Sequence, residues 1–365
     1  MKSFLARFKA KFYAFLTREL YNKIDKSLML QAEILSRSNL LFLEAFLSQN
    51  RGGGQNRLKT SQNPQNLSQN LHAQQNRTQN PQNLPFDSSD FHALQNLLQN
   101  PRNRNVSLES FEFSVFSQNG EDGIIDFLIE VLELEKSEFP KAFVEFGVQN
   151  YTESNTRYLL KKRNFNGLII DGSEKNIAFI KSDELYWRFD LCAKCAFITR
   201  ENIDGIIKEW LDSTQISNVA LLSIDIDGVD YFVWEAIECV NPAIVVIEYN
   251  ALLGSTEAKS VPYRADFERF RADFSGLYFG ASIKALVNLG AKKGFKFIGA
   301  DSSGTNLFFI NNALAKKVDF LHIHSFEEYC NRHKARQSRD KNGHLNFMRG
   351  KSRISHLKNK DFASF

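Results

Sequence analysis

The alternation of apolar and polar positions predicts a regular series of strands and helices between residues 110 and 312. Short apolar runs bounded by turn residues are typical of buried strands, and here they alternate with segments that carry apolar side chains every three to four positions. Strands are expected at 142–147, 167–171, 186–190, 219–226, 243–249, 295–298 and 306–310, and helices at 124–134, 154–163, 175–182, 199–211, 229–238 and 281–292. This order predicts an α/β fold, with a doubly wound, mostly parallel seven-stranded sheet whose last two strands form an antiparallel hairpin.

The pattern before this region is helical. Residues 3–47 contain neither Pro nor Gly, and their apolar side chains recur at a spacing close to three and four. Residues 1–48 are therefore expected to form one long helix or two short ones. Two interpretations of its aromatic stripe stay open, because a basic flank suits peripheral contact with an anionic membrane, whereas a packing seam suits a coiled coil and a homo-oligomer.

Residues 49–108 have a different composition. Gln-Asn pairs recur after a run of three glycines, and the segment has too little apolar area to offset the cost of ordering the chain. It is expected to be a disordered linker. The domain organisation is then an N-terminal helix (1–48), a linker (49–108), a folded domain (109–320) and a basic C-terminal tail (321–365).

The charge of the chain is concentrated at its two ends. The formal net charge is +4, but residues 1–26 carry seven Lys and Arg against two acids, and residues 331–360 carry ten against one. Such ends favour anionic partners. The C-terminal residues are interpreted as a solvated tail, with attraction of a phosphorylated or lipid-linked molecule as the functional alternative. Nucleic acid is not expected as a partner, since no aromatic-rich recognition module accompanies the basic residues.

Cysteine content and hydropathy bear on location. Four cysteines in 365 residues do not suggest a disulfide framework, and Cys192 and Cys195 lack the second Cys/His pair that a zinc site needs. No apolar run approaches the roughly 18 residues needed to span a bilayer. The expected location is the cytoplasm, with peripheral attachment at the inner face of a membrane as an extension of it.

Acidic residues follow the predicted strands at the edge of the sheet where ligands bind in doubly wound folds. Asp171, Asp190, Asp225, Asp227 and Glu248 lie at or just beyond strand ends. Any one of them could simply cap the following helix. Their repetition at equivalent positions favours a ligand site.

Several motifs together resemble one family. Glu145-Phe146-Gly147 is similar to the acid-x-Gly turn of S-adenosylmethionine-dependent methyltransferases, and Asp171 matches the acid of their second strand. The combination over residues 111–312 resembles the FkbM-type methyltransferases. The segments that carry this resemblance are 117–123 (Ser-Gln-Asn-Gly-Glu-Asp-Gly), 154–156 (Ser-Asn-Thr), 223–230 (Ser-Ile-Asp-Ile-Asp-Gly-Val-Asp), Pro242, 247–248 (Ile-Glu), 278–283 and 304–309.

The resemblance implies a Rossmann-like methyltransferase fold, S-adenosyl-L-methionine as cofactor, and methyl transfer to a hydroxyl of a sugar, in a surface glycan or lipid-linked precursor. The implied cofactor-binding residues are Gln118, Glu145, Gly147, Asp171, Ser173 and Asp190. The implied catalytic residues are Asp225, which faces the methyl donor, and Asp227 and Glu248, the candidate bases.

Other roles for these three acids stay open. Asp227 could instead fix the following turn by accepting from the amides of Gly228 and Val229. The three carboxylates could also hold a Mg²⁺-like ion, but shared hydrogen bonds and proton uptake are favoured, and no metal is predicted.

One departure from the family pattern lies in the turn itself. Val148, Gln149, Asn150 and Tyr151 follow Gly147 where further glycines are usual. Tyr151 could act as a lid over the cofactor, or it could narrow the pocket. The second possibility leads to a different hypothesis of function, a non-catalytic methyltransferase-like scaffold in glycan assembly.

Overall fold

The structure is a computed structural model that describes residues 27–40, 106–332 and 337–365. Residues 27–40 are helical, in agreement with that part of the N-terminal prediction. The remainder of the N-terminal helix and the Gln/Asn-rich linker up to residue 105 lie outside the described residues, as do the membrane and oligomer interpretations attached to them. Within the described ranges, no helix combines the length and hydropathy that crossing a membrane requires.

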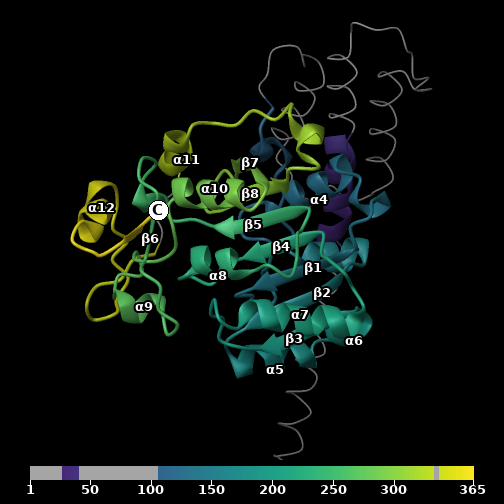
Figure 1. Cartoon of the computed structure of the whole chain (residues 1–365), viewed down its shortest axis with the longest axis horizontal. Coiled ribbons are helices and arrows are strands. Elements are labelled where there is room, and N and C mark those ends of the chain that lie inside the picture. Colours follow the sequence, from purple (N-terminus) through teal and green to yellow (C-terminus); the bar gives the residue numbers. More distant parts are fainter. Residues whose placement is uncertain (1–26, 41–105, 333–336) are drawn as a thin grey trace, which may run out of the picture. The chain divides into compact units, whose positions relative to one another are not determined.

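A seven-stranded sheet forms the centre of the molecule, with the strand order β3-β2-β1-β4-β5-β8-β7 (Figure 1). Its strands are β1 (Ala142–Phe146), β2 (Asn166–Asp171), β3 (Leu191–Cys195), β4 (Leu221–Ile224), β5 (Ile244–Glu248), β7 (Phe295–Ala300) and β8 (Asn306–Asn311). The first five strands pair in parallel, whereas β8 runs antiparallel to both β5 and β7. The predicted doubly wound, mostly parallel sheet with its closing hairpin is confirmed.

Helices cover both faces of this sheet. They include α4 (Glu121–Val131), α5 (Glu174–Ser182), α6 (Glu184–Arg188), α7 (Ile203–Thr214), α8 (Asp230–Ala236) and α10 (Ile283–Lys292). Three further helices are α9 (Arg269–Ala272), α11 (Phe326–Arg332) and α12 (Lys351–Leu357), of which α9 and α12 lie away from the sheet at one end of the molecule (Figure 1). A π-helical turn follows β1 (Leu159–Arg163), and shorter 3-10 turns occur at Leu108–Phe111, Leu134–Lys136, Ala251–Leu253 and Ala315–Val318. Arg163 of the π-helical turn forms an ion pair with Asp126 of α4 at 2.7 Å.

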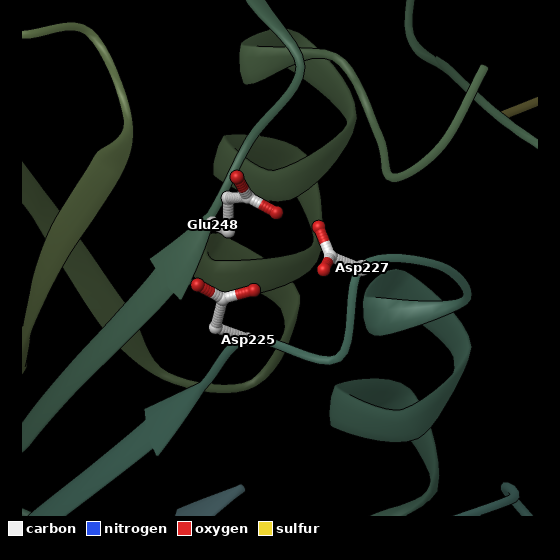
Figure 2. Close-up of side chains that lie close together, drawn as sticks. All are labelled: Asp225, Asp227 and Glu248. Atoms are coloured by element: carbon white, nitrogen blue, oxygen red, sulfur yellow. The ribbon is translucent and has the colours of Figure 1, made fainter. Parts of the chain in front are cut away.

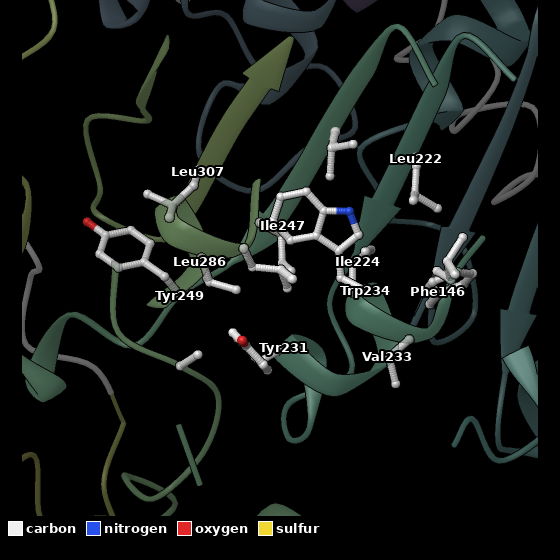
Figure 3. Packing of buried hydrophobic residues seen from close by; sticks show 14 of the residues in the cluster. Phe146, Leu222, Ile224, Tyr231, Val233, Trp234, Ile247, Tyr249, Leu286 and Leu307 are labelled. Carbon is white, nitrogen blue, oxygen red and sulfur yellow. The ribbon is translucent and has the colours of Figure 1, made fainter. Parts of the chain in front are cut away.

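The main core lies between the sheet and helices α7, α8 and α10. Trp234 of α8 is 1% exposed and lies at its centre, with its ring centroid 5.0 Å from that of Phe309 in β8. Figure 3 shows Trp234 between the helix and the apolar side chains of β4 and β5, among them Ile224 and Ile247. Alternate residues of the strands supply this face, as a sheet covered by helices requires.

One predicted strand is wrong. Residues 186–190 do not form a strand, because the side chain of Asp183 accepts a hydrogen bond from the Leu185 amide at 2.9 Å and begins helix α6 instead. The apolar residues that suggested a strand include Trp187, which is 71% exposed. The true third strand, β3, begins one residue after Asp190.

The described part of the C-terminal segment is folded, so the interpretation as a solvated tail is wrong for it. Strand β9 (Ala363–Ser364) pairs antiparallel with β6 (Lys259–Ser260) in a second, two-stranded sheet. Buried Asp273 accepts hydrogen bonds from His356 at 2.8 Å and from Lys360 at 2.6 Å. Some of the basic residues that suggested a solvated tail therefore bind a buried carboxylate and attach the C-terminal segment to the rest of the domain.

Asp273 is expected to stabilise the fold in a pH-dependent way. Burial opposes its ionisation, but hydrogen bonds from Lys360, Ser275 and His356 outweigh burial and lower the pKa of Asp273 to about 2. A lowered carboxyl pKa contributes stability that is present above the unfolded pKa of about 4 and is lost as the pH falls toward 2. Asp273→Asn should therefore lower the free energy of unfolding by about 2 kcal/mol at neutral pH, and by progressively less below pH 4.

Urea denaturation at neutral and acidic pH checks this expectation. Asp319, whose surface ion pair with Lys296 spans 2.6 Å, provides the matched control. Asp319→Asn should cost less than about 1 kcal/mol at either pH. Equal effects of the two substitutions would contradict a special role for the buried carboxylate.

Candidate functional site

The strand order reverses direction between β1 and β4, and the crevice at this switch point is where doubly wound sheets bind ligands. Gly147 follows β1 with φ +68°, and its backbone is exposed. A Cβ atom at this position would lie 1.7 Å from the carbonyl oxygen of Asp225, beyond β4. The neighbouring strand tip therefore allows only glycine here, whatever ligand the crevice binds.

The turn after Gly147 keeps a left-handed backbone at alternate positions although the usual glycines are missing. Gln149 and Tyr151 have φ of 49° and 61°. A left-handed conformation costs a residue with a side chain roughly 1–2 kcal/mol, so local contacts must offset it. The Gln149 amide donates to Asp171 at 2.8 Å, and the Tyr151 side chain is buried.

Tyr151 is not a lid over this turn. Its ring is 1% exposed, and its hydroxyl lies 2.9 Å from Thr156 Oγ1 inside the protein. Arg157 donates to its carbonyl oxygen at 2.7 Å. Because Gly147 remains exposed while Tyr151 is buried, the ring does not cover the glycine.

Asp171 lies at the end of β2 and organises the surface beside the turn. Its carboxylate accepts from the amides of Gln149 (2.8 Å) and Ser173 (2.9 Å) and from Asn176 Nδ2 (2.9 Å). The Ser173 side chain accepts from the Asn176 amide and begins helix α5. A carboxylate has about four lone-pair sites, so three donors leave room for one more.

Glu145 is a structural residue in this arrangement. It is buried in β1 and accepts from the Asn155 amide at 2.8 Å and from both the amide and the hydroxyl of Thr156. Burial raises the pKa of Glu145 to about 7, despite these hydrogen bonds. Glu145 is 4% exposed. Its carboxylate therefore fixes the loop after β1.

Gln118 is exposed on a loop that a buried carboxylate holds in place. Asp122 Oδ2 accepts from the three consecutive amides of residues 115–117, at 2.6–2.9 Å. Burial raises the pKa of Asp122 to about 7. The acids of the 117–123 motif thus build the loop, and Gln118 is its exposed member.

Asp190 does not belong to the site. It precedes β3, and its carbonyl oxygen accepts from the amide of Gly167 near the beginning of β2, at 2.9 Å. This is the amino-terminal edge of the sheet, opposite the switch point. An exposed aromatic residue, Phe197, lies two residues beyond the carboxyl end of β3, 3.7 Å from the position of a Cβ on Gly172. Sequence reasoning missed Phe197 because it placed the strand too early.

Asp225, Asp227 and Glu248 do come together, and Figure 2 shows their carboxylates converging from the tips of β4 and β5 and the loop before α8. One oxygen from each lies within 4.8 Å of the others. Burial, together with the charges of Asp227 and Asp230, raises the pKa of Asp225 well above its usual range, and a hydrogen bond with Glu248 works against this shift. The raised pKa favours the protonated form of Asp225 at a pH where an isolated aspartate would be ionised.

The turn between β4 and α8 is fixed by Asp230, and not by Asp227. Asp230 is fully buried and accepts from the amides of Ile226 (2.9 Å) and Gly228 (3.0 Å). Asp227 has φ 56° and an exposed side chain. The turn-fixing alternative for Asp227 is wrong, and its carboxylate is directed to the cluster.

Arg269 of α9 is a further member of the site. Its guanidinium forms an ion pair with Asp227, donates to the Gly276 carbonyl oxygen at 2.6 Å and lies 3.8 Å from the centroid of the Phe279 ring. These three contacts hold both the cation and Asp227 in place. The pairing spans 42 residues, and no local sequence signal indicates it.

The three carboxylates offer hard oxygen ligands of the kind that Mg²⁺ prefers. Their spacing is compatible with one divalent cation. Arg269 already neutralises part of their charge, and proton uptake by Asp225 neutralises more. The geometry thus fits either a bound cation or a shared proton.

Comparison with known proteins adds little beyond this geometry. No protein-family model and no curated protein sequence matches the chain, so the FkbM resemblance stays a prediction. The N-terminal domain of EvdMO1 with SAH bound is similar at a TM-score of 0.34 and 10% sequence identity, over 54% of this chain and 82% of that one. CurJ carbon methyltransferase gives 0.33 and 9%, over 56% of each chain. TehB from Haemophilus influenzae gives 0.28 and 13%, over 50% of this chain and 61% of that one. Similarities at these TM-scores carry no argument about cofactor or reaction.

Proposed function

We propose that the chain is an S-adenosylmethionine-dependent methyltransferase that acts on a hydroxyl group, in a sugar of a surface glycan or of its lipid-linked precursor. The observation that carries the proposal is the arrangement at the switch point. The exposed Gly147 turn, Asp171 and the carboxylate cluster lie at one edge of the sheet. This arrangement supports a nucleoside site beside an acid–base group.

Each group of the cofactor has a candidate partner. Gly147 leaves room for the amino-acid moiety because it has no side chain. Asp171 has acceptor capacity for a ribose hydroxyl. Phe197 exposes about half of its surface beside Gly172 and offers an aromatic face for the adenine ring. When bound, the cofactor would supply an electrophilic methyl group on a sulfonium sulfur.

The carboxylate cluster would serve the acceptor. Methyl transfer would require the acceptor hydroxyl to lose its proton, and a residue of the chain would have to accept it. A carboxylate with a raised pKa is a suitable base near neutral pH, because proton transfer is most efficient when the pKa lies close to the operating pH. The deprotonated form of Asp225 fits this role best, with Asp227 held nearby by Arg269. Positioning and water exclusion would supply the rest of the rate.

One observation favours the alternative of a non-catalytic scaffold. Asp171 already accepts from Gln149, Ser173 and Asn176, and the Gln149 bond closes the turn onto the ribose position. If a nucleoside hydroxyl does not displace the hydrogen bond from the Gln149 amide to Asp171, the domain would not bind the cofactor.

Binding of S-adenosylhomocysteine separates the two functions. We expect calorimetric titration of the wild type to show one site, and we expect Asp171→Ala to remove it, since a lost charged acceptor costs roughly 1.5–3 kcal/mol, tenfold or more in affinity. Asp171→Asn, which keeps one acceptor, should retain weak binding.

Asp183→Ala is the matched control. Asp183 is also an aspartate whose carboxylate accepts from a backbone amide, but it does so at the beginning of helix α6, away from the switch point. Its substitution should leave binding unchanged. Absence of binding in folded wild-type protein would refute the enzyme and support the scaffold.

A further inference from the structure

Residues 264–280 and 337–365 pack against each other beside the main core and are here called the C-terminal lobe. Figure 1 places α9, α12 and β6 together at one end of the molecule, with α5 and α6 at the other. The Arg339 amide donates to the Ser275 carbonyl oxygen at 3.2 Å, and the Tyr278 hydroxyl donates to that of Asp361 at 2.5 Å. With the His356 and Lys360 bonds to Asp273, these contacts make the two segments one structural unit.

The surface of this lobe exposes an unusual number of large apolar side chains. Eleven are exposed among the described residues, and six of these belong to the lobe, with exposed fractions of 36–57%. Five are Phe270, Phe274, Leu345, Phe347 and Ile354, and the sixth, Phe365, stacks on the ring of Tyr231 in α8. Scattered single apolar residues need no explanation, but a group of them within one small unit indicates an interaction surface.

Contacts within the lobe link the chain segments that carry these side chains. Arg339 lies 5.6 Å from the centroid of the Phe270 ring and forms a β-bridge with Leu345. The Phe274 ring lies 5.4 Å from that of His356, which is two residues from Ile354 in α12. The 264–280 segment is thus held against the 337–365 segment at Phe270 and at Phe274.

Basic residues are interspersed with this apolar group. Residues 337–365 contain seven Lys and Arg against two Asp. Lys341, Arg349, Lys351 and Lys358 are exposed, in contrast to buried Arg353. Residues 264–280 add three Arg and three acids, so the lobe carries ten Lys and Arg against five Asp and Glu. Its exposed surface therefore offers both cations and apolar groups.

We propose that the C-terminal lobe is a docking surface for an anionic lipid bilayer. Aromatic and aliphatic side chains among lysines and arginines match a membrane interface, where the apolar groups enter the acyl boundary and the cations face lipid phosphates. Nucleic acid fits less well, because its phosphates attract the cations but it offers no apolar phase in which Leu345 or Ile354 could be buried. Charge complementarity and apolar exposure together favour the bilayer.

The docking would have a consequence at the candidate site, and this step rests on the proposed function. The 264–280 segment also carries Arg269, which pairs with Asp227. A docked lobe would therefore hold the carboxylate cluster close to the membrane surface. A lipid-linked acceptor presents its sugar there.

Vesicle sedimentation with the full chain tests the proposal. The probes are phosphatidylcholine vesicles with and without phosphatidylglycerol. Wild type should bind the anionic vesicles and lose binding as salt is added. Phe347→Ser with Ile354→Ser should lower the partition coefficient about tenfold. Combining Arg349→Gln, Lys351→Gln and Lys358→Gln should lower the partition coefficient roughly hundredfold at low salt, since each cation contributes about 1 kcal/mol near such a surface.

Trp187→Ser is the matched control, because Trp187 is a highly exposed aromatic residue on α6, outside the lobe. It should bind vesicles like the wild type, and unchanged urea midpoints would show that all variants are folded. The proposal would be overturned if the lobe variants partitioned like the wild type. It would also be overturned if the wild type bound neutral vesicles as well as anionic ones. If the lobe variants lost binding to homopolymer RNA but bound vesicles like the wild type, the surface would be assigned to nucleic acid instead. None of these readouts needs methyl transfer, so they succeed or fail separately from the proposed function.

Discussion

Gly147→Ala is expected to destabilise the domain strongly, by about 2–5 kcal/mol. The new methyl group would lie 1.7 Å from the carbonyl oxygen of Asp225, so the tips of β1 and β4 would have to separate. A side chain at φ +68° adds strain of roughly 1–2 kcal/mol, and forcing a methyl group into packed surroundings adds about 1–3 kcal/mol. The shift of Asp225 should also weaken S-adenosylhomocysteine binding beyond the loss of stability.

Urea denaturation measures the first effect, and Gly205→Ala is its control. Gly205 lies in helix α7, and a Cβ there would meet nothing within 4 Å. Alanine should stabilise this helix position by roughly 0.5–1 kcal/mol. If Gly147→Ala were as stable as the wild type, the close approach of the two strand tips would be incorrect.

The central sheet could be predicted from the sequence because its strands are continuous apolar runs separated by helical periods. Val245 and Ile247 of β5, for example, are fully buried, and such runs are typical of parallel strands covered on both faces. The acids at the tips of β2, β4 and β5 were predicted for the same reason, since their positions follow from where the strands end.

The details of the site depend on contacts between distant residues and could not be predicted. Asp227 and Asp230 have similar sequence surroundings, and only the fold shows that Asp230 holds the turn while Asp227 meets Arg269. Gln149 and Tyr151 looked unsuitable for a turn that usually contains glycines. Hydrogen bonds with Asp171 and Thr156 hold them there, and the sequence pattern does not indicate these partners.

Charge patterning misled the interpretation of the C-terminal residues. A run rich in Lys and Arg is usually solvated, but His356 and Lys360 converge on a single buried acid, Asp273, that lies more than 80 residues earlier in the chain. Composition records the charges and does not show which of them find a buried partner.

Asp225→Asn is expected to lower kcat for methyl transfer by about 10²–10⁴, the usual contribution of a general base, while S-adenosylhomocysteine binding is retained. Burial and the neighbouring charges of Asp227 and Asp230 raise the pKa of Asp225 to about 8. Only the deprotonated carboxylate can accept the hydroxyl proton, so the wild-type rate should rise with pH and level off above 8. An ordinary aspartate would reach its plateau near pH 5. Labelled methyl transfer over this pH range provides the measurement.

The comparison of three variants assigns the base. Asp212→Asn, on the exposed surface of α7, is the control and should leave both rate and pH profile unchanged. Asp227→Ala should spare cofactor binding and suppress turnover, because it removes the partner that Arg269 holds beside Asp225. It should, however, keep a rising pH profile, whose midpoint falls because one neighbouring negative charge is gone. If Asp225→Asn kept the wild-type rate and only Asp227→Ala lost it, Asp227 would be the base, and the raised pKa of Asp225 would be a consequence of packing three carboxylates at one edge of the sheet.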